Sequence, residues 1–221
     1  MIKAVFFDLD GTLIDTQEVI IKGFKYLFDR YLPSKKTIDE EDYKQILGPA
    51  LKDSFKYYFG PDHDFDLLLS GYRLATNDLL NKENIKLVPR TAKLIKILKN
   101  KGIRLAVITS RQHISALRVL KVFNLVEDFD VIIGCTDVQE VKPHPESFNK
   151  ALKALNIKAN EAIMIGDTAN DIVGAKRAGI KSYAVKWATS PLEELLACGA
   201  TGVIEDMMDI VEIVEDAKND L

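Results

Sequence analysis

The feature that most constrains the fold of this chain is an apolar run near its N-terminus that ends abruptly in two carboxylates, Asp8 and Asp10. Residues 2–7 have the length and composition of a buried strand, and Gly11 marks a sharp turn at the end of that strand. In an open parallel α/β sheet, ligands bind in the crevice outside the carboxyl ends of the strands. We therefore expect Asp8 and Asp10 to belong to a functional site.

The composition is that of a globular protein without a strong electrostatic preference. The 221 residues carry a formal net charge of −3, and 47% of them are hydrophobic and 29% charged. This balance supports a substantial core and argues against nucleic acid or a membrane surface as a partner. No window approaches the roughly 18 apolar residues of a membrane span, and Cys135 and Cys198 form no metal-like pair. We expect a cytoplasmic protein, either a monomer or a homodimer.

The residues after the first strand have helical periodicity in place of a second strand. The expected helices cover residues 18–31, a segment that starts near residues 37–39 and stops at residues 48–49, and then residues 50–59 and 66–80. Four short helices can bury a common core. We predict that residues 17–86 form a small helical bundle of their own, inserted after the first strand.

From Val88 onward, helices alternate with short apolar strands, which is typical of a doubly wound parallel sheet. The expected strands cover residues 104–108, 130–133, 162–165, 183–185 and 202–204. The expected helices cover the segment before Gly102 and residues 114–123, 147–155, 169–178 and 207–216. The fold class is therefore α/β, with a Rossmann-like core made by residues 1–16 and 87–221.

Polar residues follow three of the expected strands, and a lysine lies on a connecting loop. They are Asp8 and Asp10, Thr109 and Ser110, Asp167 and Asp171, and Lys142. If these strands are neighbours, several carboxylates meet in one crevice, where oxygen ligands would select a hard cation such as Mg²⁺. The lysine, the hydroxyl and backbone N–H groups of residues 9–11 remain available for a phosphoryl group.

The same residues indicate a mechanism for attack on phosphorus. No serine, cysteine or histidine is placed beside a base, but the carboxylate of Asp8 can act as a covalent nucleophile and form an aspartyl phosphate. A second carboxylate can protonate the leaving oxygen and later activate water. Asp10, two residues further along, is suited to that role.

Four motifs resemble those of the haloacid dehalogenase-like hydrolase superfamily, in the same order and over nearly the whole chain. They are Asp8-Leu9-Asp10-Gly11-Thr12, Val107-Ile108-Thr109-Ser110, Lys142-Pro143 and Gly166-Asp167-Thr168-Ala169-Asn170-Asp171. The resemblance implies that Asp8 is the nucleophile, Asp10 the acid/base, and Thr109 and Lys142 the phosphate anchors. It also implies Mg²⁺ held by Asp8, the main-chain carbonyl of Asp10 and Asp167, with Asp171 holding or orienting the ion.

Within this superfamily the chain looks most like phosphoglycolate phosphatases and pyrophosphate or small phosphate-ester hydrolases that carry a helical cap. Gly48-Pro49-Ala50-Leu51 matches a cap loop that reaches toward the substrate. Thr109-Ser110-Arg111 departs from the usual Thr-Asn-Lys. The residues expected to contact the substrate, a small phosphorylated metabolite, are Leu9, Gly11, Thr12, Gly48, Thr109, Ser110, Arg111 and Lys142.

Two other functions use similar residues. A phosphoglucomutase would return the phosphoryl group to a sugar, and a signalling module would accept phosphate on an aspartate without turnover. For the hydrolase we expect the cap to close over the site, with hinges near Thr16 and between Ile85 and Pro89. We also expect Asp15 and Thr16 to cap the first helix of the cap.

Overall fold

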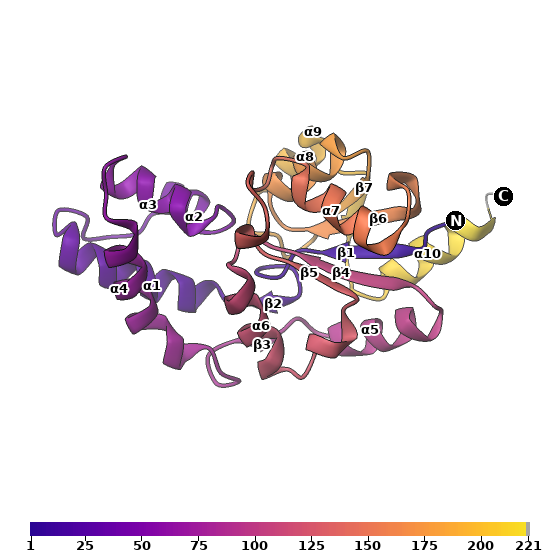
Figure 1. The fold of residues 1–221 in the computed structure, drawn as a ribbon, viewed down its shortest axis with the longest axis horizontal. Helices are drawn as coiled ribbons and strands as arrows, with labels where there is room; N and C mark the ends of the chain where they lie inside the picture. Colours follow the sequence, from indigo (N-terminus) through magenta and orange to yellow (C-terminus); the bar gives the residue numbers. More distant parts are fainter. Residues whose placement is uncertain (220–221) are drawn as a thin grey trace.

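The centre of the molecule is a six-stranded parallel sheet, seen in a computed structural model that describes residues 1–219 (Figure 1). The strands are β1 (Ala4–Phe7), β4 (Arg104–Ile108), β5 (Val131–Ile133), β6 (Ala162–Gly166), β7 (Lys181–Val185) and β8 (Gly202–Ile204), in the spatial order β5-β4-β1-β6-β7-β8. Strand β1 therefore lies between β4 and β6, where the strand order reverses. In doubly wound folds this reversal is the place where ligands bind.

Helices cover both faces of the sheet (Figure 1). One face packs against α5 (Thr91–Asn100), α6 (His113–Val122) and α10 (Asp209–Asn219), and the other packs against α7 (Glu146–Leu155), α8 (Ala169–Arg177) and α9 (Leu192–Cys198). Short 3₁₀ helices lie in the connections: η2 (Val126–Asp128), η3 (Cys135–Asp137) and η4 (Ala159–Glu161). This is the doubly wound α/β architecture predicted from the sequence.

The alternation of side chains along β1 explains why the strand is apolar throughout. Val5 and Phe7 point into the core beneath α5, α6 and α10, while Ala4 and Phe6 point into the core beneath α7 and α8. All four side chains are fully buried. A strand that is covered on both faces needs apolar residues at every position, because neither side meets water.

The segment between β1 and β4 forms a separate group of helices, which lies to the left of the sheet in Figure 1. It contains α1 (Gln17–Tyr31), α2 (Glu40–Ile46), α3 (Leu51–Phe59), α4 (Phe65–Thr76) and the 3₁₀ helix η1 (Asn77–Leu79). These helices bury their own hydrophobic cluster, centred on the Phe24 ring. That ring lies within 6.0 Å, between centroids, of the rings of Phe28, Phe55, Tyr58 and Tyr72.

The two linkers between this helical segment and the sheet pair with each other. Strand β2 (Ile14–Asp15) runs antiparallel to β3 (Lys86–Leu87), and the Val88 N–H donates to the Leu13 carbonyl at 2.9 Å. These short strands lie where we place the cap boundaries and hinges, which remain predictions. Two-residue strands carry no periodic signal, so the sequence pattern did not indicate them.

The other predicted elements are present, with ends that shift by a few residues. The helix expected over residues 66–80 ends at Thr76 and continues as η1, and α9 was not predicted. Its seven residues complete only about two turns, too short for a clear helical repeat. Within residues 1–219, no helix combines the length and the apolar character needed to cross a membrane.

The aromatic cluster predicts which substitution weakens the helical segment most. Phe24→Ala should lower the free energy of unfolding by about 3–5 kcal/mol, because it removes a fully buried ring from the centre of the cluster. Urea denaturation would measure this change. Leu74→Ala is the control, since Leu74 lies in α4 with 73% of its surface exposed and should change stability by less than about 0.5 kcal/mol. Equal midpoints for the two variants would contradict the packing described here.

Candidate active site

The parallel register brings the polar residues of three strands to one edge of the sheet. Asp8 follows β1, Thr109 follows β4 and Asp167 follows β6. The Asp8 N–H donates to the Ile165 carbonyl of β6 at 2.9 Å, so the ladder continues to the first carboxylate. Three segments far apart in sequence thereby meet where the strand order reverses.

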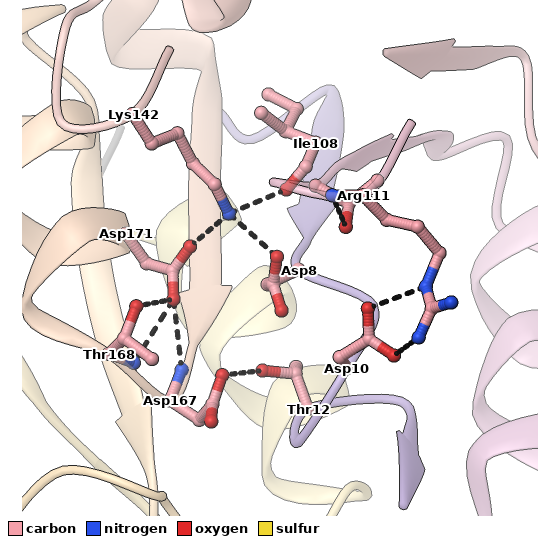
Figure 2. A network of polar contacts seen from close by, with 10 residues as sticks. Asp8, Asp10, Thr12, Ile108, Arg111, Lys142, Asp167, Thr168 and Asp171 are labelled. Carbon is pink, nitrogen blue, oxygen red and sulfur yellow. Dashed lines mark hydrogen bonds and ion pairs between the residues drawn. The ribbon is translucent and has the colours of Figure 1, made fainter. Parts of the chain in front are cut away.

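The ammonium of Lys142 joins these strand ends (Figure 2). Its Nζ lies 2.6 Å from Asp8 Oδ1, 2.6 Å from Asp171 Oδ1 and 3.0 Å from the Ile108 carbonyl. Asp8, Asp171 and Lys142 are all buried. Three acceptors for three N–H bonds satisfy the buried ammonium fully.

Asp171 is a positioning carboxylate at the start of α8. Its Oδ2 accepts hydrogen bonds from the Thr168 N–H at 3.0 Å and the Thr168 hydroxyl at 2.8 Å, which forms a capping box with Thr168. Both of its oxygens are therefore occupied. At Gly166 a Cβ would lie 2.4 Å from the Asp171 Cβ, so this turn needs glycine.

Asp167 is held from the opposite side. Its Oδ1 accepts the Thr12 hydroxyl at 3.1 Å, and its Oδ2 accepts the Thr189 N–H at 3.4 Å. A Cβ at Gly11 would lie 2.2 Å from Asp167 Oδ2, and Gly11 has a φ of +79°. Glycine at position 11 therefore lets the turn after β1 pass close to Asp167, which follows β6.

Burial of this charge cluster shifts its pKa values. Burial, together with the neighbouring carboxylates, raises the pKa of Asp8 well above its ordinary value, although Lys142 acts in the opposite direction. Burial, followed by the Asp171 carboxylate, raises the pKa of Asp167 to about 7. Burial works to lower the pKa of Lys142, but Asp171 and Asp8 outweigh it and raise that pKa. The cluster contains more negative charge than one ammonium can offset.

The donor set fits a hard divalent cation. Asp8, Asp167 and Asp171 each offer a carboxylate oxygen, and these oxygens lie within 4.8 Å of one another. Hard cations such as Mg²⁺ prefer carboxylate oxygens, and a cation would lower the raised pKa values. Asp171 already uses both oxygens, so Asp8 and Asp167 are the more available ligands.

Asp10 lies apart from this cluster and forms a second ion pair. The Arg111 guanidinium donates two hydrogen bonds to the Asp10 carboxylate, from Nε to Oδ2 at 2.9 Å and from Nη2 to Oδ1 at 2.6 Å (Figure 2). The Thr16 hydroxyl also donates to Asp10 Oδ1. Burial works to raise the pKa of Asp10, but Arg111 and Thr16 outweigh it and hold the pKa below its ordinary value.

A cleft of about 980 Å³ opens above the two carboxylates Asp8 and Asp10, between the helical segment and the sheet edge. Its basic and acidic side chains are Lys52, Lys56, Arg73, Arg111, Arg118 and Lys142, and Asp8, Asp10, Asp53 and Glu140. Apart from the buried cluster and the Asp10–Arg111 pair, the cleft wall carries four cations, Lys52, Lys56, Arg73 and Arg118, against two carboxylates, and this local excess of cations favours an anionic ligand.

Hydrogen bonds cross from the helical segment to the core around this cleft. Arg73 Nη2 of α4 donates to Gln112 Oε1 at 2.6 Å. Gln17 Nε2 of α1 donates to Thr189 Oγ1 at 3.2 Å. The helical segment is therefore seated on the sheet edge in this structure.

The structure brings most of the predicted site residues to the cleft or directly beneath it. Lining the cleft are Asp8, Asp10, Gly48, Thr109, Ser110, Arg111 and Lys142, and beneath it lie Asp167 and Asp171. Leu9, Gly11 and Thr12 do not line it, because Leu9 is fully buried, the Gly11 N–H donates to the Ile14 carbonyl and Thr12 holds Asp167. A role for these three in binding substrate stays a prediction.

Two expectations for the first linker need separate comment. Thr16 occupies the N-cap position of α1, as expected, but a capping hydrogen bond from its side chain is wrong, because its hydroxyl donates to Asp10 instead. Asp15 Oδ1 does accept the Gln17 N–H, at 3.3 Å. The side chain of Asp10 is not part of the acidic cluster, so its metal role through the main-chain carbonyl stays a prediction.

Sequence reasoning did not find Thr189 or Tyr72 at the site. Thr189 lies in the loop after β7 and Tyr72 in the middle of α4, where the helical pattern indicates only a core residue. No local motif marks either residue. Their position depends on how the helical segment sits on the sheet.

Comparison with known proteins gives consistent results over nearly the full length. A family model described as haloacid dehalogenase-like hydrolase matches residues 5–185. Pyrophosphatase PpaX of Halalkalibacterium halodurans is 37% identical over 213 residues, which cover 96% of this chain and 97% of that protein. Pyrophosphatase PpaX of Bacillus cereus strain Q1 is 34% identical over 215 residues, 97% of both chains.

Solved structures agree in fold. A predicted phosphatase from Clostridium acetobutylicum has a TM-score of 0.83 at 29% identity, covering 98% of this chain and 99% of its own. CbbY from Rhodobacter sphaeroides in complex with phosphate has a TM-score of 0.81 at 26% identity, covering 94% of this chain and 95% of its own. The similarity includes both the sheet and the helical segment.

The raised pKa of Asp167 predicts a pH dependence for metal binding. Asp167 is mostly protonated below pH 7 and ionised above it, and only the ionised carboxylate binds Mg²⁺ well. We expect the Mg²⁺ affinity of the protein to increase about tenfold from pH 6 to pH 8, as measured by isothermal titration calorimetry. Asp167→Asn should weaken binding at pH 8 and remove most of the increase. Equal affinities at the two pH values would contradict the assignment.

Proposed function

The chain belongs to the haloacid dehalogenase-like hydrolase family, and from this premise we propose that it is a Mg²⁺-dependent phosphatase that acts through an aspartyl phosphate on Asp8. The observation that supports this most strongly is the placement of Asp8. Its carboxylate lies in the cleft, held at one oxygen by Lys142, with Asp167 on one side and Asp10 on the other. A carboxylate held in this way can attack phosphorus.

In the first step, an Asp8 carboxylate oxygen forms a bond to phosphorus, and the bond from phosphorus to the leaving oxygen breaks. Lys142 donates to Oδ1, so Oδ2 is the oxygen available for attack. Where the leaving oxygen needs a proton, Asp10 gives it from its protonated form and becomes the carboxylate that Arg111 and Thr16 stabilise. Mg²⁺ bound by Asp8 and Asp167 would neutralise charge on the phosphoryl oxygens.

In the second step, water attacks the phosphorus of the aspartyl phosphate. Asp10 accepts a proton from that water and returns to its protonated form, and the bond between Asp8 and phosphorus breaks, which releases phosphate and restores the Asp8 carboxylate. Lys142 remains beside Asp8 in both steps and offsets charge on the phosphoryl group. Thr109 lines the cleft after β4 and is suited to donate a hydroxyl bond to the same group.

The proposed substrate is a small phosphate anhydride or ester, with pyrophosphate as the first candidate. Relatives 34–37% identical to this chain are pyrophosphatases, and the cleft has the excess of cations that a compact, highly charged anion requires. A phosphoglycolate-like ester would use the same nucleophile and the same anchors. Comparison of catalytic efficiencies on both substrates ranks them.

The helical segment acts as a cap in this proposal. Gly48 in the loop before α3 approaches Thr168 of the core so closely that a Cβ would lie 2.8 Å from Thr168 Cγ2. Thr168 is the residue that caps α8 and contacts Asp171. Closure at this point excludes bulk water from the reacting group.

Replacement of the nucleophile tests the proposed function directly. Asp8→Asn should lower phosphate release from pyrophosphate with Mg²⁺ at least about 1000-fold, because the amide cannot attack phosphorus. Wild-type protein exposed briefly to ³²P-labelled substrate should retain acid-stable label, and Asp8→Asn should not. Asp15→Asn, an exposed carboxylate in β2, is the matched control and should keep full activity.

Other results would contradict the proposal in distinct ways. An Asp8→Asn variant with full activity would exclude the nucleophile. Labelling of Asp8 without continued release of phosphate would indicate a phospho-accepting signalling module. Turnover that requires a sugar bisphosphate would indicate a phosphomutase.

The close approach of Gly48 predicts the effect of one added methyl group. Gly48→Ala should lower kcat/KM for pyrophosphate about tenfold or more, because the new Cβ meets Thr168 and holds the cap loop away from the core. Gly60→Ala is the control, since Gly60 has a similar positive φ, +85° against +102°, but nothing within 4 Å of its added Cβ. Steady-state kinetics would measure both. The proposal fails if the two variants lose activity equally.

A further inference from the structure

Tyr72 of α4 presents an unused hydroxyl to the cleft. The residue is only 7% exposed, and its ring packs against Phe24 and Phe55. A Cβ at Gly23 would lie 2.4 Å from the ring, so glycine at that position makes room for it. Among the described residues the hydroxyl has no hydrogen-bond partner. The ring is held by its neighbours, while the hydroxyl is not enclosed by protein and can be reached by a ligand in the cleft.

Arg111 lines the same cleft as Tyr72. Arg111 and Asp10 both act electrostatically on the Tyr72 hydroxyl, and burial raises its pKa to about 12, so it remains a donor. The Arg111 side chain is 11% exposed. Three of its five N–H groups are used, two on Asp10 and one on the Ser115 hydroxyl at 3.0 Å. The remaining N–H groups are available to a ligand.

We propose that the Tyr72 hydroxyl and the Arg111 guanidinium form a subsite that binds the leaving group, and that this group is anionic, as in the non-transferred phosphate of a compact diphosphate. The inference rests on the proposed function. A phosphate in this position supplies acceptor oxygens to donors that come from two sides, the cap and the core. It also lies next to Asp10, the residue that handles the proton of the leaving oxygen.

If the leaving group has no acceptor oxygens, the Tyr72 hydroxyl and the free N–H groups of Arg111 have no hydrogen-bond partner in the complex. A site built to hydrogen-bond part of a substrate discriminates strongly against analogues that lack it, because its buried polar groups then lose their partners. Tyr72 and Arg111 therefore determine specificity, in addition to the residues that hold the transferred phosphoryl group. Because Tyr72 belongs to the cap, cap closure completes the subsite.

The variant Tyr72→Phe tests the subsite, because it removes only the hydroxyl and leaves the packed ring. We expect kcat/KM for pyrophosphate with Mg²⁺ to fall about tenfold or more, with most of the change in KM. Hydrolysis of p-nitrophenyl phosphate, whose leaving group carries no second anion, should change less than about twofold. The matched control is Tyr58→Phe, since the Tyr58 hydroxyl bonds Asp42 at 2.8 Å within the helical segment and is not among the cleft-lining residues.

A binding measurement separates affinity from catalysis. In the Asp8→Asn background, Tyr72→Phe should weaken binding of the non-hydrolysable analogue imidodiphosphate about tenfold and leave binding of inorganic phosphate unchanged. Equal loss on pyrophosphate and p-nitrophenyl phosphate, or no loss on either, would overturn the subsite and leave the proposed function intact. A wild-type protein that hydrolyses neither compound would overturn the proposed function, and this inference with it.

Discussion

The bridge of Lys142 between Asp8 and Asp171 is the interaction on which the rest of the site depends. Three carboxylates at two strand ends repel one another in a buried position, and the ammonium joins two of them at 2.6 Å. Removal of one member of such a buried set leaves an uncompensated charge, which is strongly destabilising. Burial, followed by the neighbouring carboxylates, raises the pKa values of Asp8 and Asp167 although Lys142 acts in the opposite direction. The remaining negative charge is what a divalent cation would neutralise.

The sheet and the helical segment make different contributions to the cleft. The sheet holds polar side chains at fixed positions. Asp8, Thr109 and Asp167 directly follow parallel strands that are buried on both faces. The helical segment supplies walls and donors such as Tyr72, held by an aromatic core of its own. In the proposed mechanism the reacting groups therefore belong to the core, and the side of the cleft that meets the leaving group belongs to the helical segment.

Sequence patterns predicted the sheet and the polar strand ends because both are local signals. A run such as Val5–Phe7 is apolar at every position, and its end is marked by Asp8 and Gly11. The ion pair of Asp10 with Arg111 was not predictable, since the two residues are 101 positions apart and the pair depends on tertiary packing. The hydroxyl of Thr16 was assigned to a helix cap by a local rule, but it donates to Asp10, six residues earlier in the turn after β1. The rule for helix caps fails here because the fold brings a carboxylate within reach of the same hydroxyl.

The pairing of β2 with β3 has a consequence for how this fold can diversify. The chain enters the helical segment after Ile14 and leaves it at Leu87, and these two residues lie opposite each other in the antiparallel pair. The residues between them are therefore joined to the core by two paired linkers. A different set of helices could be inserted between these linkers without a shift in any of the six parallel strands. Selectivity could change in this way while the arrangement of Asp8, Lys142 and Asp167 in the core stays the same.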